Sequence, residues 1–185
     1  MTPAQQAIIK ADILASNDMN TFSLNGDGAY SIANLYNAPA IPAFNVWRTD
    51  VPVNDILDAI DFSKYTPVDA PELTGIYTAR ALAIQTKQMN LQMMLQGRDT
   101  LNAGKTNVRN GLRDAVIALP AGTNGASVTA GGASGVNVMN ACIRPATRLE
   151  KLLSSVPVAT GGVSAGVLSF EGQVSYQDIE AARNT

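Results

Sequence analysis

The sequence predicts a mainly α protein: a helical bundle of about five to six helices, followed by a C-terminal β-strand or hairpin arm. Apolar residues recur at helical spacing through most of residues 1–155. A stretch rich in glycine and other small residues follows, and apolar and polar residues then alternate over residues 168–176. We therefore expect a bundle domain over residues 1–155, and a linker, β arm and short terminal helix over residues 156–185.

The first helix is predicted to begin at residue 3. Thr2 is a suitable N-cap, Pro3 suits the first helical position, and Gln5 completes a capping box. Two shorter helices are expected over residues 27–37 and 53–60, because apolar residues recur there every three or four positions.

The longest helix is expected over residues 72–96 and should end at Gly97. Its apolar residues form two opposite stripes, Leu73, Tyr77, Ile84, Leu91 and Leu95 on one side and Gly75, Ala79, Leu82, Met89 and Met93 on the other. A helix with two apolar stripes must be covered on two sides. The second cover is either another helix of this chain or a neighbouring subunit, and in the latter case Leu82, Met89 and Met93 are the candidate subunit contact.

Two further helices are expected over residues 108–119 and 136–154, joined by a flexible glycine-rich loop over residues 121–135. Pro145 should kink or divide the second of these helices. Cys142 lies on the apolar seam of that helix and is expected to be a buried, unreactive side chain.

Charge is unevenly distributed along the chain. Residues 1–79 hold three basic and nine acidic side chains, a net charge of −6, whereas residues 80–151 hold nine basic and three acidic ones, a net charge of +6. Such a division suits head-to-tail contact between identical subunits, or a basic face turned toward nucleic acid. Solvated helix surfaces would also account for it.

Five basic residues have the spacing of a shared face. They are Arg144, Arg148 and Lys151 at i, i+4 and i+7, and Arg109 and Arg113 at i and i+4 on the preceding predicted helix. This candidate basic face would line a DNA channel without reading sequence, or pair with Asp55, Asp58 and Asp61 of a neighbouring subunit. A solvated surface is the third interpretation.

The alternating segment near the C-terminus is predicted to be a partner-docking arm. Leu168, Phe170, Val174 and Tyr176 would lie on one apolar face of a strand. A single strand beyond a helical bundle needs a partner for its backbone groups. That partner would be a hairpin mate in this chain or the sheet of a neighbouring protein.

The side chains available for catalysis are few. The chain has no histidine and one cysteine, so the imidazole groups of common catalytic sites and the usual ligands of Zn²⁺, haem and iron–sulfur clusters are missing. No phosphate-binding glycine motif is complete. With so few catalytic and ligand side chains, we expect no enzyme and no cofactor. We also expect no membrane span and no signal peptide, because the apolar runs are only a few residues long.

Several short motifs resemble one group of proteins. These are the opening MTPAQQ, Asn37-Ala-Pro39, Val46-Trp47-Arg48-Thr49, Arg144-Pro145-Ala-Thr-Arg148-x-Glu150-Lys151, and Phe170-Glu171-Gly172 followed by Ser175-Tyr176-Gln177-Asp178. They resemble small virion morphogenesis proteins of tailed bacteriophages, in particular head–tail connector (adaptor) subunits. Apart from the 121–135 loop, the resemblance extends over most of the chain.

The resemblance implies a mainly helical, homo-oligomeric ring, with a dodecamer as the implied order. Such a ring lies below the portal protein, binds neck and tail proteins, and can contact packaged DNA non-specifically. It is found in the neck of the virion after assembly in the host cytoplasm, and carries no catalytic residue. The alternatives are another neck, tail-completion or capsid-associated structural protein, or a soluble helical protein that binds nucleic acid non-specifically.

Overall fold

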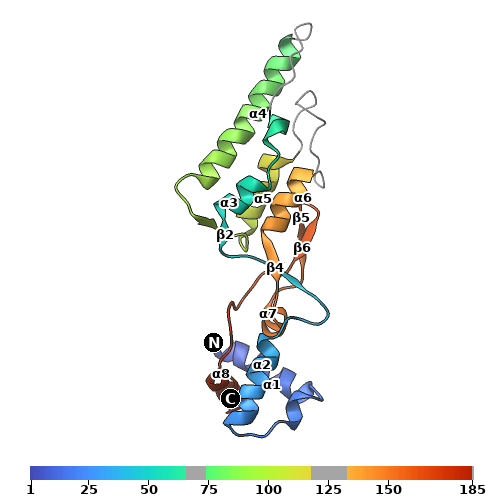
Figure 1. Ribbon diagram of the computed structural model, residues 1–185, viewed down its shortest axis with the longest axis vertical. Coiled ribbons are helices and arrows are strands. Elements are labelled where there is room, and N and C mark those ends of the chain that lie inside the picture. Colours follow the sequence, from blue (N-terminus) through green and yellow to red (C-terminus); the bar gives the residue numbers. More distant parts are fainter. Residues whose placement is uncertain (66–73, 118–132, 185) are drawn as a thin grey trace. The chain divides into compact units, whose positions relative to one another are not determined.

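The computed structural model describes residues 1–65, 74–117 and 133–184, and these are mainly helical with small two-stranded sheets (Figure 1). The described helices are α1 (Pro3–Ala15), α2 (Gly26–Asn37), α3 (Val53–Asp58), α4 (Thr74–Leu95), α5 (Thr106–Val116), α6 (Ala133–Ala141), α7 (Arg148–Leu153) and α8 (Tyr176–Asn184), with 3-10 turns η1 (Met19–Thr21) and η2 (Phe62–Tyr65). β1 (Asn45–Trp47) pairs with β4 (Ile143–Pro145), β2 (Val51–Pro52) with β3 (Thr100–Leu101), and β5 (Val158–Thr160) with β6 (Val163–Ala165).

The chain divides into two compact units. Unit 1 comprises Met1–Val46, Pro145–Pro157 and Gly166–Thr185, and unit 2 comprises Trp47–Arg144 and Val158–Ala165. This division differs from the predicted one, which separated residues 1–155 from a C-terminal arm. The segment expected to form the arm contributes to both units instead.

Unit 1 is built from helices that come from both ends of the chain. α8 lies against both α1 and α2, so the first and last helices are neighbours (Figure 1). Their apolar faces form one core with α7, made up of Ile9, Ile13, Met19, Ala29, Ile32, Ala33, Tyr36, Leu149, Leu153, Val174, Ile179 and Ala182. The predicted start of the first helix is confirmed, because the side chain of Thr2 accepts from the backbone N–H of Gln5 and the reciprocal bond is also present.

The C-terminal β structure is a hairpin, as expected in outline, but it lies earlier in the chain. The strands are β5 and β6, and the turn between them uses Gly161 and Gly162 with φ of 59° and 87°. Two-residue hairpin turns favour positive φ at both positions, which glycine adopts without strain. The segment expected to be a flexible linker is therefore an antiparallel hairpin.

No strand forms over residues 168–176, where the alternating pattern predicted one. Val174 is buried in the core of unit 1, Leu168 and Phe170 are half-buried, and Tyr176 is exposed at the start of α8. The amide of Asn37 takes the place of a neighbouring strand: its Nδ2 donates to the carbonyl of Val174 and its Oδ1 accepts from the N–H of Val174, both at 2.9 Å. The predicted docking arm is thus part of a folded unit.

Unit 2 contains the longest helix, α4, which contacts α5; α5 in turn contacts α6. α4 lies within the predicted range and ends shortly before Gly97, whose φ is 69°. The expected helix over residues 136–154 is divided at Pro145 into α6, β4 and α7. Residues 121–132 of the predicted loop lie outside the described residues, and residues 133–135 belong to α6.

Within the described ranges, none of the helices is both long enough and apolar enough to cross a membrane.

Candidate functional site

The two stripes predicted on α4 have different surroundings. Ile84 and Leu91, on the first stripe, are 2% and 5% exposed and pack into unit 2. Leu82, Met89 and Met93, on the second, are 63%, 54% and 71% exposed. We call these three residues the apolar ridge. At about 100° per residue the ridge points away from the buried stripe, so the described parts of the chain leave it open to solvent.

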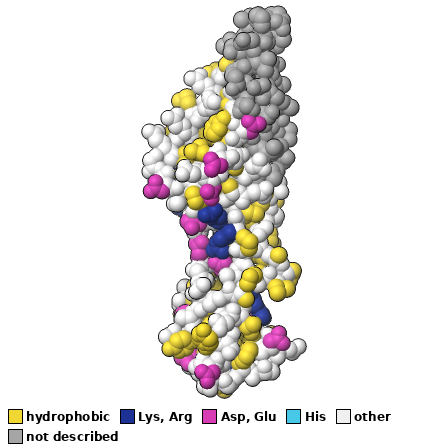
Figure 2. All heavy atoms as spheres, in the orientation of Figure 1, with side chains coloured by type: hydrophobic (Ala, Val, Ile, Leu, Met, Phe, Trp, Pro, Cys, Tyr) yellow, Lys and Arg dark blue, Asp and Glu magenta, His cyan; other side chains and the backbone are white. Residues whose placement is uncertain are grey.

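A second apolar surface lies beside α4 in the same unit. It is a cavity of about 460 Å³ between α4 on one side and α3 and η2 on the other, and we call it the apolar groove. Its lining residues are Val53, Leu57, Phe62, Tyr65, Leu91 and Leu95, with Gln88, Gln92 and Gln96 of α4 at its polar edge. None of the described residues that line the groove carries a charged side chain. Figure 2 shows hydrophobic side chains at the surface of unit 2, over the region where Figure 1 places α3 and α4.

Phe62 lines the groove and is itself partly exposed to solvent. Phe62 is 52% exposed and contacts the buried Tyr65, with ring centroids 6.2 Å apart. The hydroxyl of Tyr65 donates to the carbonyl of Ala115 at 2.8 Å, which fixes the ring against α5. Burial raises the pKa of Tyr65 to about 12, so the hydroxyl stays protonated at neutral pH.

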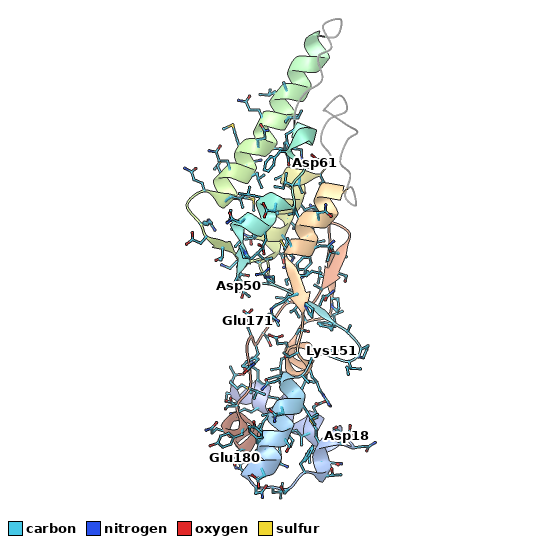
Figure 3. The ribbon with its side chains drawn as sticks, viewed as in Figure 1. Asp18, Asp50, Asp61, Lys151, Glu171 and Glu180 are labelled. Atoms are coloured by element: carbon cyan, nitrogen blue, oxygen red, sulfur yellow. The ribbon has the colours of Figure 1, made fainter. Side chains whose placement is uncertain are left out.

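Charged residues of both signs lie beside the ridge. Asp58 and Asp61 lie on the segment that runs from α3 to η2, and Asp61 is labelled in Figure 3. Lys87, Arg98 and Asp114 line a cavity that also includes Met93 of the ridge. The Nζ of Lys87 donates to the carbonyl of Asp114 on α5 and to that of Ile117, which follows α5. Burial lowers the pKa of Lys87.

The candidate basic face does not form as predicted, and Arg109 is the clearest case. Its side chain is 1% exposed, stacks over the ring of Trp47 at 4.8 Å, and donates from Nη1 to the carbonyls of Ala103 and Gly104 at 2.7 and 2.8 Å. Arg109 is therefore a structural residue of the unit 2 core and cannot contribute to a solvent-facing surface. The helical spacing did not show this because Trp47 is distant in the sequence.

Arg113 lies on the same helix but is committed to a local ion pair. Its guanidinium contacts the carboxylate of the adjacent Asp114 at 2.7 Å. Asp55, the expected partner of this basic face in a neighbouring subunit, already forms an ion pair within the chain, because Arg48 contacts it at 3.1 Å.

The remaining three cations do not share a helix face. Arg144 lies on β4, whereas Arg148 and Lys151 lie on α7, because Pro145 interrupts the predicted helix. Lys151, labelled in Figure 3, donates to the carbonyl of Pro42 at 3.1 Å. The i, i+4, i+7 interpretation of Arg144, Arg148 and Lys151 is thus wrong.

Arg148 belongs to a small polar cluster in unit 1. Its Nη2 lies 3.8 Å from Oδ2 of Asp12, and its guanidinium stands 5.7 Å over the ring of Tyr36. The hydroxyl of the buried Tyr36 donates to the same carboxylate at 2.8 Å. Burial and the bond to Asp12 raise the pKa of Tyr36, so its phenol stays protonated at neutral pH. The contacts of this cluster join α1, α2 and α7.

The motifs behind the phage resemblance mostly hold unit 1 together. Two helix starts in this unit carry capping boxes besides that of α1: Thr147 with Glu150 at α7, and Ser175 with Asp178 at α8. Gly172 has a φ of 107°, a conformation that favours glycine, and its N–H donates to Oε1 of Glu150 at 3.4 Å. These motif residues therefore have a structural role that requires no ligand.

Within the described ranges, no group of three or more histidine, cysteine, aspartate or glutamate side chains could hold a metal ion. Cys142 is buried, as its position on an apolar seam predicted, and burial raises the pKa of its thiol to about 12. A thiol with that pKa is a poor nucleophile at neutral pH.

Searches of protein-family models, of curated proteins and of solved structures give no match for this chain.

Proposed function

We propose that this chain is a structural subunit of a tailed-phage virion, a head–tail connector that assembles with copies of itself and joins the portal to neck and tail proteins. The observation that carries the assembly role is the apolar ridge. Leu82, Met89 and Met93 are large, mostly exposed and aligned on one side of a long helix. Aligned apolar side chains on a helix face are typical of protein contact surfaces.

Methionine at two of the three ridge positions fits this role. Its unbranched, polarizable side chain adapts to irregular surfaces, and methionine is common on faces that bind other proteins. Full burial of a large apolar side chain contributes about 1.5–3 kcal/mol. The three ridge side chains are already partly buried, so covering the rest would contribute roughly 3–6 kcal/mol, at the low end of the roughly 4–15 kcal/mol of freedom lost on association. One ridge contact alone is therefore weak, and a closed assembly with several contacts would be stable.

The connector role rests on the sequence motifs. The residues that carry the resemblance come from five separate stretches of the chain, and several of them meet in unit 1 through capping boxes and side-chain bonds. A shared pattern of this kind is typical of a shared fold. The described contacts favour assembly over DNA binding as the main role, because Arg113 and Arg148 contact carboxylates and Arg109 is buried.

Location in the particle tests the proposal directly. Phage particles purified from the host of the encoding genome should contain the chain at a fixed copy number by quantitative mass spectrometry. Immunogold labelling should place it at the head–tail junction. Particles that lack the chain, or label on the capsid surface or tail tip, would contradict the connector role.

A genetic test separates assembly from folding. Phage carrying Met89→Lys and Met93→Lys should produce heads and tails that fail to join, because the lysines place charge on the ridge. Leu82→Ala keeps the surface apolar and should have a smaller effect. Gln173→Lys with Gln177→Lys adds the same two charges at exposed positions of unit 1, away from α4, and is the matched control.

A further inference from the structure

We propose that Met89 and Met93 are a site of reversible methionine oxidation, at which a peroxide makes the apolar ridge polar and so weakens association of the chain with itself. The site is inferred from the surroundings of the methionines alone. Its effect on association rests on the proposed function, in which the ridge forms the contact between copies.

The methionines of this chain differ widely in their access to solvent. All six lie in the part of the chain that the structure describes. Met89 and Met93 are 54% and 71% exposed, whereas Met19 and Met139 are completely buried. A peroxide must reach the sulfur atom to oxidise it, so the reaction follows the exposure of the thioether. The two ridge methionines are therefore the expected targets.

Met94 provides a comparison within the same helix turn. It follows Met93 directly, but the end of its side chain lies against α5 at Gly111, where a Cβ atom would come within 2.8 Å of the Met94 sulfur. This contact shields the sulfur of Met94 on the side of α5. Met1, the remaining methionine, packs against the core of unit 1 and is also partly shielded.

The position of the two ridge methionines favours their oxidised form. They are one helical turn apart, so both thioethers lie on the same face of α4. Met93 also lines a cavity with Asn90 and Arg98, whose amide and guanidinium groups are hydrogen-bond donors. A sulfoxide oxygen is a strong acceptor, whereas a thioether sulfur is a weak one. Donors beside Met93 therefore suit the sulfoxide better than the thioether.

The reaction adds one oxygen atom to each sulfur. A lone pair of the sulfur attacks one oxygen of hydrogen peroxide, a sulfur–oxygen bond forms and the oxygen–oxygen bond breaks. The departing hydroxide takes the proton of the transferred oxygen and leaves as water. The sulfur loses two electrons and the peroxide gains them. A methionine sulfoxide reductase reverses the change with electrons from thiols and releases the oxygen as water.

Oxidation at exposed positions should leave the fold intact. A sulfoxide disrupts a protein when it forms in a core, but Met89 and Met93 lie outside the core of unit 2. In a contact between copies, each sulfoxide would place a polar group against apolar surface. Because a buried polar group without a partner opposes association, each sulfoxide should weaken association roughly tenfold or more.

The rate of oxidation at each methionine tests the site without reference to assembly. The wild-type chain is treated with dilute hydrogen peroxide at a concentration at which it is monomeric, and peptide mass spectrometry follows each methionine over time. Met89 and Met93 should react at least about tenfold faster than Met19 and Met139, and faster than Met94. If a buried methionine, or Met94, reacts as fast as the two ridge methionines, the proposed site is wrong.

Sedimentation velocity tests the effect on association. The oxidised wild-type chain should associate more weakly at an unchanged unfolding midpoint, and treatment with a methionine sulfoxide reductase should restore association. Met89→Leu with Met93→Leu keeps the ridge apolar without sulfur, so this variant should sediment identically before and after peroxide. Met94→Leu, outside the ridge, should keep the full response to peroxide.

The possible failures are distinguishable. Unchanged association of a chain with both ridge methionines oxidised would overturn the proposed effect, as would a loss of association in the double leucine variant after peroxide. A wild-type chain that stays monomeric before any treatment would contradict the proposed function, whereas the oxidation rates would still decide whether Met89 and Met93 are the site.

Discussion

Replacing Ile179 with alanine should destabilise unit 1 strongly. Ile179 lies on α8, is fully buried, and belongs to the core that α8 forms with α1 and α2. Truncating a buried isoleucine to alanine costs about 2–5 kcal/mol, which is a large part of the roughly 5–15 kcal/mol that stabilises a domain. Gln177→Ala, at an exposed position on the same helix, should change the free energy of unfolding by only about 0.5 kcal/mol or less.

Urea denaturation followed by far-UV circular dichroism measures both variants, and hydrogen exchange locates the effect. In the Ile179→Ala variant, the amides of α1 and α2 should exchange faster than in the wild type, because these helices lose a core contact. Equal stability of the Ile179 and Gln177 variants would refute the reasoning. It would mean that the C-terminal residues form a free arm, as the alternating sequence pattern predicts.

Three other predictions concern single side chains. The hydrogen bond from Ser175 lowers the pKa of Asp178 in the folded protein, so its stabilising effect is present above the unfolded pKa of about 3.9 and is lost as the pH falls through the folded value. Asp178→Asn should therefore be less stable than the wild type at pH 7, and the two stability curves, measured by urea denaturation, should converge in acid. Cys142 should react slowly with a thiol reagent at pH 8 and quickly in urea, as followed by absorbance; rapid reaction of the native protein would show that the thiol is accessible. Arg109→Ala should destabilise unit 2 by about 2–5 kcal/mol, because the carbonyls of Ala103 and Gly104 lose their donor and the ring of Trp47 loses its contact. Fluorescence of Trp47, the only tryptophan, reports this change, and an unchanged unfolding midpoint would contradict it.

Local signals in the sequence predicted the individual helices well. The capping box at Thr2 and Gln5 marks the start of α1, and the double stripe over residues 72–96 gives both the extent of α4 and its exposed face. These features depend on residues within a few turns of one another. Helical spacing and capping chemistry are therefore enough to predict them.

Features that depend on distant residues were missed. The alternation over residues 168–176 resembles a strand, but the side chain of Asn37 binds the backbone there and Val174 enters a core made by the first helices. The burial of Arg109 depends in the same way on Trp47. A single sequence contains no signal that pairs positions so far apart.

Two of the missed features did have a local signal. Gly161-Gly162 between two short runs of valine, alanine and serine or threonine is a two-residue hairpin pattern. Thr147 and Glu150 form a capping-box pattern that marks a helix start just after Pro145. Taken ahead of the apolar spacing, these two patterns predict the β5–β6 hairpin and the separation of α6 from α7.

Sedimentation velocity over a range of concentrations tests most directly whether the chain assembles through α4. The wild-type chain should show concentration-dependent association to species larger than a dimer, and the Met89→Lys, Met93→Lys variant should sediment as a monomer with an unchanged circular dichroism spectrum. Because one contact is weak, the series should extend to about 1 mM, where an interaction of about 4 kcal/mol becomes visible. A wild-type chain that stays monomeric throughout, or a double variant that associates as the wild type does, would contradict the account.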